Sequence, residues 1–124
     1  MEFIRNPNQQ DLSWFIDMDA QERLDLEPPY QRRSVWSSRD KQEFMDTVLN
    51  NYPCPAIYLQ RESTSEGPKY NVVDGKQRLS TILNFHKGKF RLSKNFPIVS
   101  LRGRKFANLE EKYKTNFFNY IFMV

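Results

Sequence analysis

The stretch YNVVDGKQRLSTILNF, residues 70–85, decides the fold of this 124-residue chain. Its first five residues include a tyrosine and two valines, which predicts a strand that ends at Asp74. Gly75 breaks the strand, and residues 76–87 carry apolar side chains at helical spacing. A strand is therefore expected to pass through one glycine directly into a helix. The side chains expected on the buried face of that helix are Leu79, Ile82 and Leu83.

This strand–glycine–helix turn is predicted to bind an anion. The first amides of a helix have no partner within the helix, and the helix dipole places partial positive charge there. Gly75 permits a positive φ and lets an oxyanion approach the backbone closely. Lys76 and Arg78 add charge from the first helical turn, and the planar guanidinium suits the edge of a phosphate.

Asp74, at the end of the strand, leaves two interpretations open, because an acid repels phosphate. In the first, the carboxylate caps the helix by accepting hydrogen bonds from the amides of Gln77 or Arg78. In the second, it holds a Mg²⁺ ion that bridges phosphate groups.

The segment YQRRSVW, residues 30–36, is a second candidate for ligand binding. Two prolines precede it and hold the backbone extended before the start of a helix. Gln31 offers an amide and Arg32 a guanidinium that can reach a phosphate. The two aromatic side chains of the segment either stack on a base or are anchors of the core.

The whole pattern predicts one α+β domain over residues 1–124, with a small mixed sheet, a hairpin and packed helices. The other expected helices are residues 11–18, a run from a Ser37–Asp40 capping box to Asn50, and a run from an N-cap at Asn108 to about Thr115. The other expected strands are residues 23–27, 56–60, 89–92 and 117–124. Residues 61–69 are expected to be a polar loop that joins residues 56–60 and 70–74 into the hairpin.

The C-terminal stretch FFNYIFMV is apolar to the last residue. A bare strand of this kind needs neighbours on both faces and is prone to aggregate. We therefore expect the chain to be an N-terminal fragment of a longer protein. The alternative is a short protein whose last strand is central in its sheet or lies in a homodimer.

The charge of the chain is unevenly distributed. Residues 1–62 hold 7 Lys and Arg against 11 Asp and Glu, and residues 63–124 hold 12 against 4. No acidic residue occurs between Asp74 and Glu110. The basic residues in this gap are Lys76, Arg78, Lys87, Lys89, Arg91, Lys94, Arg102, Arg104 and Lys105. The gap forms either a solvated basic face or a surface that attracts nucleotide phosphate or DNA.

Composition excludes several classes of protein. One cysteine, Cys54, rules out an internal disulfide and a zinc site built from cysteines, and one histidine, His86, argues against a histidine-based metal site. No apolar run reaches the eighteen residues typical of a membrane span, and the N-terminal residues lack a secretory signal core. The cytoplasm is the expected compartment, and no membrane partner is expected.

Three segments in order, PPYQRRSVW (28–36), EFMDTVLNNYPCPAIYL (43–59) and residues 70–85, resemble a known family. It is the family of prokaryotic domains with a D-G-Q-Q-R motif, which form the N-terminal part of GmrSD-type modification-dependent restriction endonucleases. That family is similar to the ParB/sulfiredoxin superfamily, whose N-P-x-Q-P-R and G-E-R-R stretches correspond to residues 29–32 and 75–78. The resemblance covers nearly the whole chain and implies a ParB/sulfiredoxin-like fold. This chain departs from the common motif in having Lys76 at its third position.

The resemblance implies a domain that binds a nucleoside triphosphate, hydrolyses it with Mg²⁺, and regulates a nuclease domain outside these residues, often of HNH type. The predicted nucleotide-binding residues are Gln31, Arg32, Gly75, Lys76, Gln77 and Arg78. Asp74 and Gln77 are the predicted catalytic residues, and Asp74 is also the predicted ligand of Mg²⁺. Whether this chain hydrolyses nucleotide by itself is left open.

Two other functions compete with this one. A non-enzymatic ParB-like module would bind DNA through the basic second half, with no need for nucleotide. A metal-dependent nuclease would need clustered carboxylates, and residues 63–124 offer only four acidic side chains. DNA contacts are thus expected through the basic half or through an appended domain, and a homodimer is left open.

Overall fold

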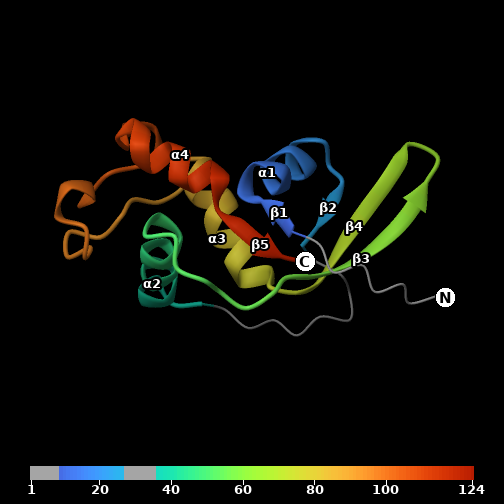
Figure 1. Cartoon of the computed structure of the whole chain (residues 1–124), viewed down its shortest axis with the longest axis horizontal. Coiled ribbons are helices and arrows are strands. Elements are labelled where there is room, and N and C mark those ends of the chain that lie inside the picture. The colour runs from blue at the N-terminus through green and yellow to red at the C-terminus, as the bar shows by residue number, and fades with distance from the viewer. Residues whose placement is uncertain (1–8, 27–35) are drawn as a thin grey trace.

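The computed structural model describes residues 9–26 and 36–124. Within them the chain folds into helices and two small sheets, which confirms the predicted α+β class (Figure 1). The elements in chain order are β1 (Gln9–Asp11), α1 (Leu12–Ala20), β2 (Leu24–Asp25), α2 (Ser38–Leu49), β3 (Tyr58–Thr64), β4 (Gly67–Asp74), α3 (Lys76–His86), α4 (Glu111–Asn119) and β5 (Ile121–Met123). Two 3₁₀ turns, Val99–Leu101 and Phe106–Asn108, lie between α3 and α4. Every described helix is too short or too polar to cross a bilayer.

Strand β4 is the centre of the larger sheet, whose order is β2-β4-β3. It pairs parallel with β2 and antiparallel with β3. The smaller sheet pairs β1 with β5 in antiparallel register, Gln10 opposite Phe122. An amide of the segment that enters β3, that of Ile57, donates to the carbonyl of Met123 at 2.8 Å, so β5 adjoins the start of the hairpin.

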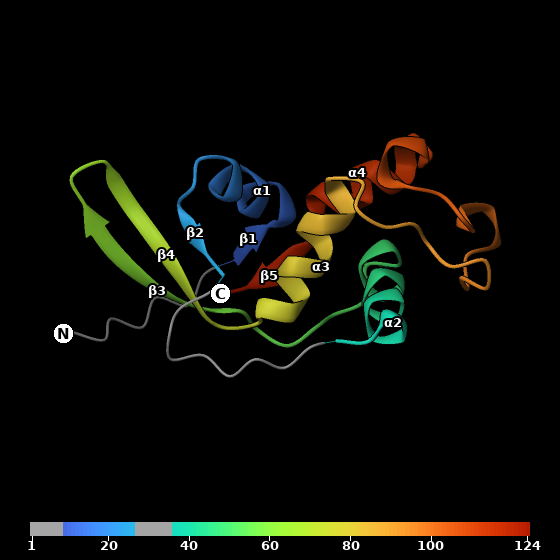
Figure 2. The ribbon, with the colours of Figure 1, turned by 180° about the vertical axis from the view of Figure 1, so that it is seen from behind.

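Helix α3 runs through the middle of the molecule, with α1, α2 and α4 around it (Figures 1 and 2). Its predicted buried side chains are buried, and they join one core with side chains from α1, α2, α4 and β5. Helix α2 begins with the predicted capping box, in which Ser37 and Asp40 each bond the backbone amide of the other. Gly88, just past α3, adopts φ 76°, as expected of a glycine that ends a helix.

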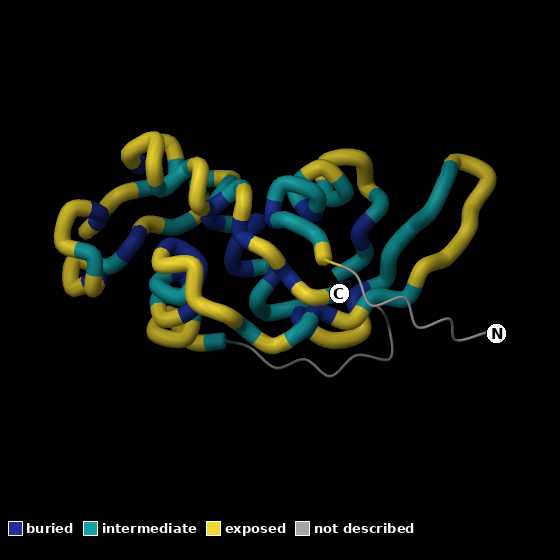
Figure 3. Tube along the Cα trace, in the orientation of Figure 1, coloured by how far each residue is buried: buried dark blue, intermediate teal, exposed yellow. Residues whose placement is uncertain are grey.

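The β3–β4 hairpin is longer than the sequence predicts. The expected polar loop over residues 61–69 is wrong, because β3 continues to Thr64 and β4 begins at Gly67. The paired strands project from the body, and the side chains of β3 beyond Gln60 are exposed (Figures 1 and 3). The outer part of β3 is therefore held as a strand by backbone pairing with β4, since its side chains bury little surface.

Three predictions in the second half are also wrong, in whole or in part. Residues 89–92 form no strand; Leu92 instead exchanges backbone hydrogen bonds with Gly103 and Arg104. Asn108 ends a 3₁₀ turn, and the true N-cap of α4 is Glu110. Helix α4 extends to Asn119 and takes in the first part of the run expected to be a strand, because Phe117 packs against Phe85 of α3 at 6.2 Å between ring centroids.

Residues 88–110 form a lobe that projects at the opposite end of the molecule from the hairpin (Figures 1 and 2). Its own buried side chains are Leu92, Phe96, Leu101 and Leu109. Gln42 of α2 fastens the lobe, donating to the carbonyl of Arg91 at 2.9 Å and accepting from the amide of Ser93 at 2.8 Å. The basic segment is thus held in a defined position by the body.

Candidate nucleotide-binding turn

Strand β4 delivers the chain into α3 through a single residue, Gly75. This glycine is the N-cap of the helix and has φ 105° and ψ 11°, in the left-handed region. The predicted strand–glycine–helix turn with positive φ is therefore present. Since glycine has no side chain, the N-cap residue provides no capping hydrogen bond to the first turn of α3.

The face of Gly75 on which a Cβ would lie is filled by protein. A Cβ built there would meet Cδ1 of Ile57 at 2.3 Å, and the Ile57 side chain is fully buried. The glycine is therefore required by its backbone conformation and by the close packing of Ile57, the residue before β3, against the turn. A ligand at this turn would approach from the side of the helix amides, away from Ile57.

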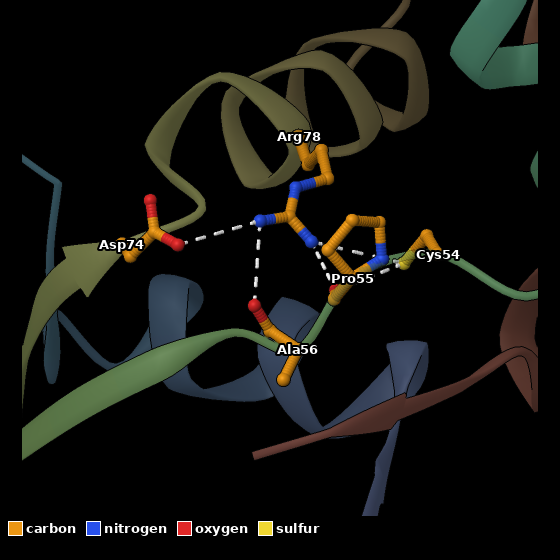
Figure 4. A network of polar contacts seen from close by, with 5 residues as sticks. All are labelled: Cys54, Pro55, Ala56, Asp74 and Arg78. Atoms are coloured by element: carbon orange, nitrogen blue, oxygen red, sulfur yellow. Dashed lines mark hydrogen bonds and ion pairs between the residues drawn. The ribbon is translucent and has the colours of Figure 1, made fainter.

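The Arg78 guanidinium, in the first turn of α3, lies against the segment that leads into β3 (Figure 4). Nη1 donates to the carbonyl of Pro55, and Nη2 donates to the carbonyl of Ala56 at 3.3 Å. The sulfur of Cys54 lies 3.9 Å from Nη1. The side chain is only 12% exposed. A direct contact between Arg78 and phosphate stays a prediction, since the described partners of this guanidinium belong to the protein.

The Asp74 carboxylate points from the strand end toward the same guanidinium, with Oδ2 3.9 Å from Nη2 of Arg78 (Figure 4). Its side chain is 66% exposed. Its described partner is the Arg78 guanidinium, and a capping role for Asp74 stays a prediction. An exposed carboxylate beside a helix start is suited to a cation that a phosphate ligand also coordinates.

No protein-only metal site is found among residues 9–26 and 36–124, where no three His, Cys, Asp or Glu side chains gather. Mg²⁺ in phosphate-handling proteins is usually held by one or two carboxylates together with phosphate oxygens and water. The single carboxylate of Asp74 fits a Mg²⁺ ion of this kind, whose other ligands are phosphate and water. One carboxylate does not fit a metal ion that the protein binds permanently by itself.

The other candidate segment reaches the turn at its C-terminal end. The amide of Trp36 donates to Oε1 of Gln77 at 3.2 Å, so a side chain of the D-G-K-Q-R motif holds the residue that closes YQRRSVW. The ring of Trp36 packs against Phe44 at 5.6 Å between centroids, which makes this aromatic an anchor of the core. Gln31 and Arg32 lie outside the described residues.

With this geometry in view, the comparison with protein families is decisive. The family model of the GmrSD restriction endonuclease N-terminal domain matches residues 12–123. The chain belongs to this family. Membership confirms the predicted resemblance and indicates a component of a restriction or phage-defence system. Searches of curated proteins and of solved structures give no match, so the ParB-like part of the fold prediction stays a prediction.

Sequence reasoning missed the groups that surround the turn of this GmrSD N-terminal domain. The carbonyls of Pro55 and Ala56 accept from Arg78, and the hydroxyl of Tyr120 donates to the carbonyl of Tyr52 at 2.5 Å. These acceptors are backbone atoms, which carry no side-chain signal in a sequence. The two prolines around Cys54 keep this segment out of a helix or a sheet ladder, and they are the sequence signal that its carbonyls are open to other donors.

The basic residues of the GmrSD N-terminal domain are not gathered at the turn. The lobe of residues 88–110 carries five exposed basic side chains, Lys89, Arg91, Lys94, Arg102 and Arg104. Lys87, at the C-cap of α3, is paired with Asp19 at 2.9 Å. Two separate places on the structure therefore carry much of the positive charge of residues 75–109: the turn, with Lys76 and Arg78, and the lobe.

Proposed function

We propose that this domain binds a nucleoside triphosphate at the β4–α3 turn, and that it hydrolyses the nucleotide with Mg²⁺ to regulate a nuclease acting on DNA. The observation that carries the proposal is the turn itself. An eleven-residue helix begins at a left-handed glycine with no capping side chain, beside an exposed carboxylate and a lysine. Helix starts of this kind favour phosphate through amides and dipole.

Each residue of the motif has a distinct part in the proposal. The backbone of Gly75, Lys76 and Gln77 binds phosphate oxygens, and the ammonium group of Lys76 adds charge. Gln31 and Arg32 contact the nucleotide from the preceding segment. Mg²⁺, when bound with the nucleotide, neutralises phosphate charge.

The catalytic residues of the proposal are Asp74 and Gln77. Asp74 is the protein ligand of the cation or orients the attacking water. Gln77 fixes the end of the YQRRSVW segment through the amide of Trp36. The gain in rate comes from positioning and electrostatics, as in other phosphoryl transfers.

The experiment that tests the proposal is titration of the 124-residue chain with ATP, GTP, CTP and UTP, each with Mg²⁺ and with EDTA, by calorimetry. Phosphate release is followed in parallel. One nucleotide is expected to bind, more tightly with Mg²⁺. Asp74→Asn is expected to remove the benefit of Mg²⁺ and to leave binding in EDTA unchanged or tighter, because without the cation the carboxylate only repels the phosphate.

Lys76→Gln tests the lysine of the turn, and Lys69→Gln is its matched control. Both lysines belong to the segment around β4, but Lys69 lies in the hairpin opposite Glu62, away from the turn. Lys76→Gln should weaken binding with and without Mg²⁺, whereas Lys69→Gln should not change it. Absence of binding heat for all four nucleotides would refute the proposal.

The lobe favours a second function, contact with the DNA backbone. Five exposed basic side chains stand on a lobe that Gln42 fastens to the body, and no acidic residue interrupts residues 75–109. Such a surface binds phosphates without regard to sequence and with strong dependence on salt. DNA contact through the lobe is compatible with a nucleotide at the turn, since the two surfaces are separate.

The test of the second function is fluorescence anisotropy with a labelled DNA duplex over a range of KCl concentrations. Each lost phosphate contact should lower the slope of log K against log salt by about 0.9. The triple variant Lys89→Gln, Arg91→Gln, Lys94→Gln is therefore expected to reduce both affinity and slope. Arg61→Gln on the hairpin is the control, because it removes positive charge at the other end of the molecule. Equal slopes for the triple variant and the wild type would exclude the lobe as a DNA-binding surface.

A further inference from the structure

Two arginines fasten the two ends of the β3–β4 hairpin in the same way. Arg78 donates to the carbonyls of Pro55 and Ala56, just before β3 begins. Arg23 donates to the carbonyl of Glu66 at 2.7 Å and that of Pro68 at 3.2 Å, at the tip. Each guanidinium spans two backbone acceptors, which the planar fork of arginine does well and the single ammonium of lysine does poorly.

The contact at the base of the hairpin differs from that at the tip in what it holds. Arg78 belongs to the first turn of α3 and also faces the Asp74 carboxylate (Figure 4). It thereby joins the end of β4, the start of α3 and residues 54–56. Both sides of Gly75 are fixed by this one guanidinium, with Ile57 packed beneath the glycine.

The segment that Arg78 grips is itself tied to the rest of the fold. The hydroxyl of Tyr120 donates to the carbonyl of Tyr52, and the amide of Ile57 donates to the carbonyl of Met123. The guanidinium is therefore attached to a fixed part of the molecule. Movement of Arg78 toward a phosphate would break its contacts with both carbonyls.

We propose that Arg78 is a positioning residue. Its guanidinium stays on the carbonyls of Pro55 and Ala56 while nucleotide is bound, and it holds Asp74 and the first turn of α3 in place for the phosphates. This inference rests on the proposed nucleotide binding. It assigns the phosphate contacts to Lys76 and the backbone, and gives Arg78 the task of shaping the turn.

The test combines calorimetry with hydrogen exchange on the 124-residue chain. The nucleotide identified by the four-nucleotide titration is the probe. Arg78→Met and Arg78→Lys are compared with Arg23→Met, the matched control that removes the same kind of contact at the hairpin tip. Amide exchange is measured over residues 52–60 in the wild type, with and without saturating nucleotide, because local exchange reports local opening.

A positioning role predicts that both Arg78 variants bind nucleotide more weakly, on the order of tenfold, the worth of one charge-assisted hydrogen bond. Lysine does not restore binding, since it keeps the charge and loses the fork. Arg23→Met loses thermal stability and keeps wild-type affinity. Nucleotide leaves exchange over residues 52–60 of the wild type unchanged or slower.

Three results would overturn the inference. If Arg78→Lys binds like the wild type, charge alone matters and Arg78 contacts phosphate. If nucleotide speeds exchange over residues 52–60, the guanidinium has left its carbonyls. If Arg78→Met is folded and binds normally, its role is only structural.

Nucleotide binding by the wild type distinguishes failure of this inference from failure of the proposed function. If Arg78→Met fails to fold, the nucleotide affinity of Arg78→Lys and the amide exchange of the wild type still test the positioning role. If the wild type binds none of the four nucleotides, the proposed function fails and the positioning role fails with it.

Discussion

Ile57 occupies the space that a side chain on Gly75 would need. Its Cδ1 atom lies 2.3 Å from the position of a Cβ on that glycine. The contact joins the last residue before β3 to the turn between β4 and α3. It shows that the glycine of the D-G-K-Q-R motif is required by packing as well as by its φ of 105°.

Gly75→Ala is therefore expected to destabilise the fold by more than the cost of the backbone conformation. A left-handed alanine costs about 1–2 kcal/mol, and displacing Ile57 adds about 1–3 kcal/mol. Gly88→Ala is the control, because Gly88 has φ 76° but nothing within 4 Å of its Cβ position. Urea unfolding should show a larger loss for Gly75→Ala. Equal losses for the two variants would mean that Ile57 moves aside freely.

Gln42→Ala is expected to loosen the lobe of residues 88–110. The Gln42 amide bonds the backbone of Arg91 and Ser93, and loss of this pair should cost about 1–3 kcal/mol. Hydrogen exchange over residues 90–104 should rise, and DNA affinity should fall if the lobe contacts DNA. Lys41→Ala, one residue away on α2, is the control. The same exchange rate in both variants would show that the lobe does not depend on Gln42.

The elements that sequence predicts well are those with local signals. The capping box at the start of α2 involves residues three apart, and the strand–glycine–helix turn lies within one continuous stretch. The buried face of α3 follows from helical spacing alone. Each of these features is determined by neighbours in the chain, so no knowledge of the tertiary structure is needed.

The elements that sequence predicts poorly depend on distant partners. The outer half of β3 is polar and exposed and is a strand only because β4 pairs with it. Phe117 belongs to an apolar run typical of a strand, yet it is helical because it packs against Phe85. Arg78 donates to carbonyls 22 and 23 residues earlier in the chain, and no pattern around Arg78 indicates these partners. Backbone acceptors leave no trace in sequence patterns.

Tyr120→Phe is expected to free the segment before β3. The Tyr120 hydroxyl donates to the carbonyl of Tyr52 at 2.5 Å, and the ring is 2% exposed. Loss of this bond should cost about 1–2 kcal/mol. Thermal unfolding measures the loss, and exchange over residues 52–57 locates it. Tyr58→Phe is the control, since that side chain is 59% exposed. A variant as stable as the wild type would show that water replaces Tyr120 at the carbonyl.

Burial, with the nearby Cys54 as a smaller cause, raises the pKa of the Tyr120 phenol far above its ordinary value of 10. A group whose pKa is raised on folding stabilises the fold below its unfolded pKa. That stability is lost as the pH rises above about 10, where the unfolded phenol ionises. The wild type should therefore lose more stability than Tyr120→Phe between pH 9 and pH 11. Parallel curves for the two proteins would contradict this.

His86 makes the fold sensitive to acid. Its ring lies 4.8 Å from that of Phe106 and is stacked on Phe117, and burial followed by the charge of Lys87 lowers its pKa below the ordinary 6.5. Near these aromatic rings and Lys87, the neutral imidazole is the stable form.

A histidine with a lowered pKa binds fewer protons in the folded state than in the unfolded state. Stability is therefore highest above pH 6.5 and falls as the pH drops from 6.5 toward the folded pKa, because the unfolded chain takes up the proton first. His86→Phe should remove this part of the pH dependence, since its ring remains among the aromatic side chains. Urea unfolding at pH 7.5 and pH 5 measures both proteins. The difference between wild type and variant should change between the two pH values, with the wild type losing more in acid. A constant difference would show that His86 titrates alike in both states.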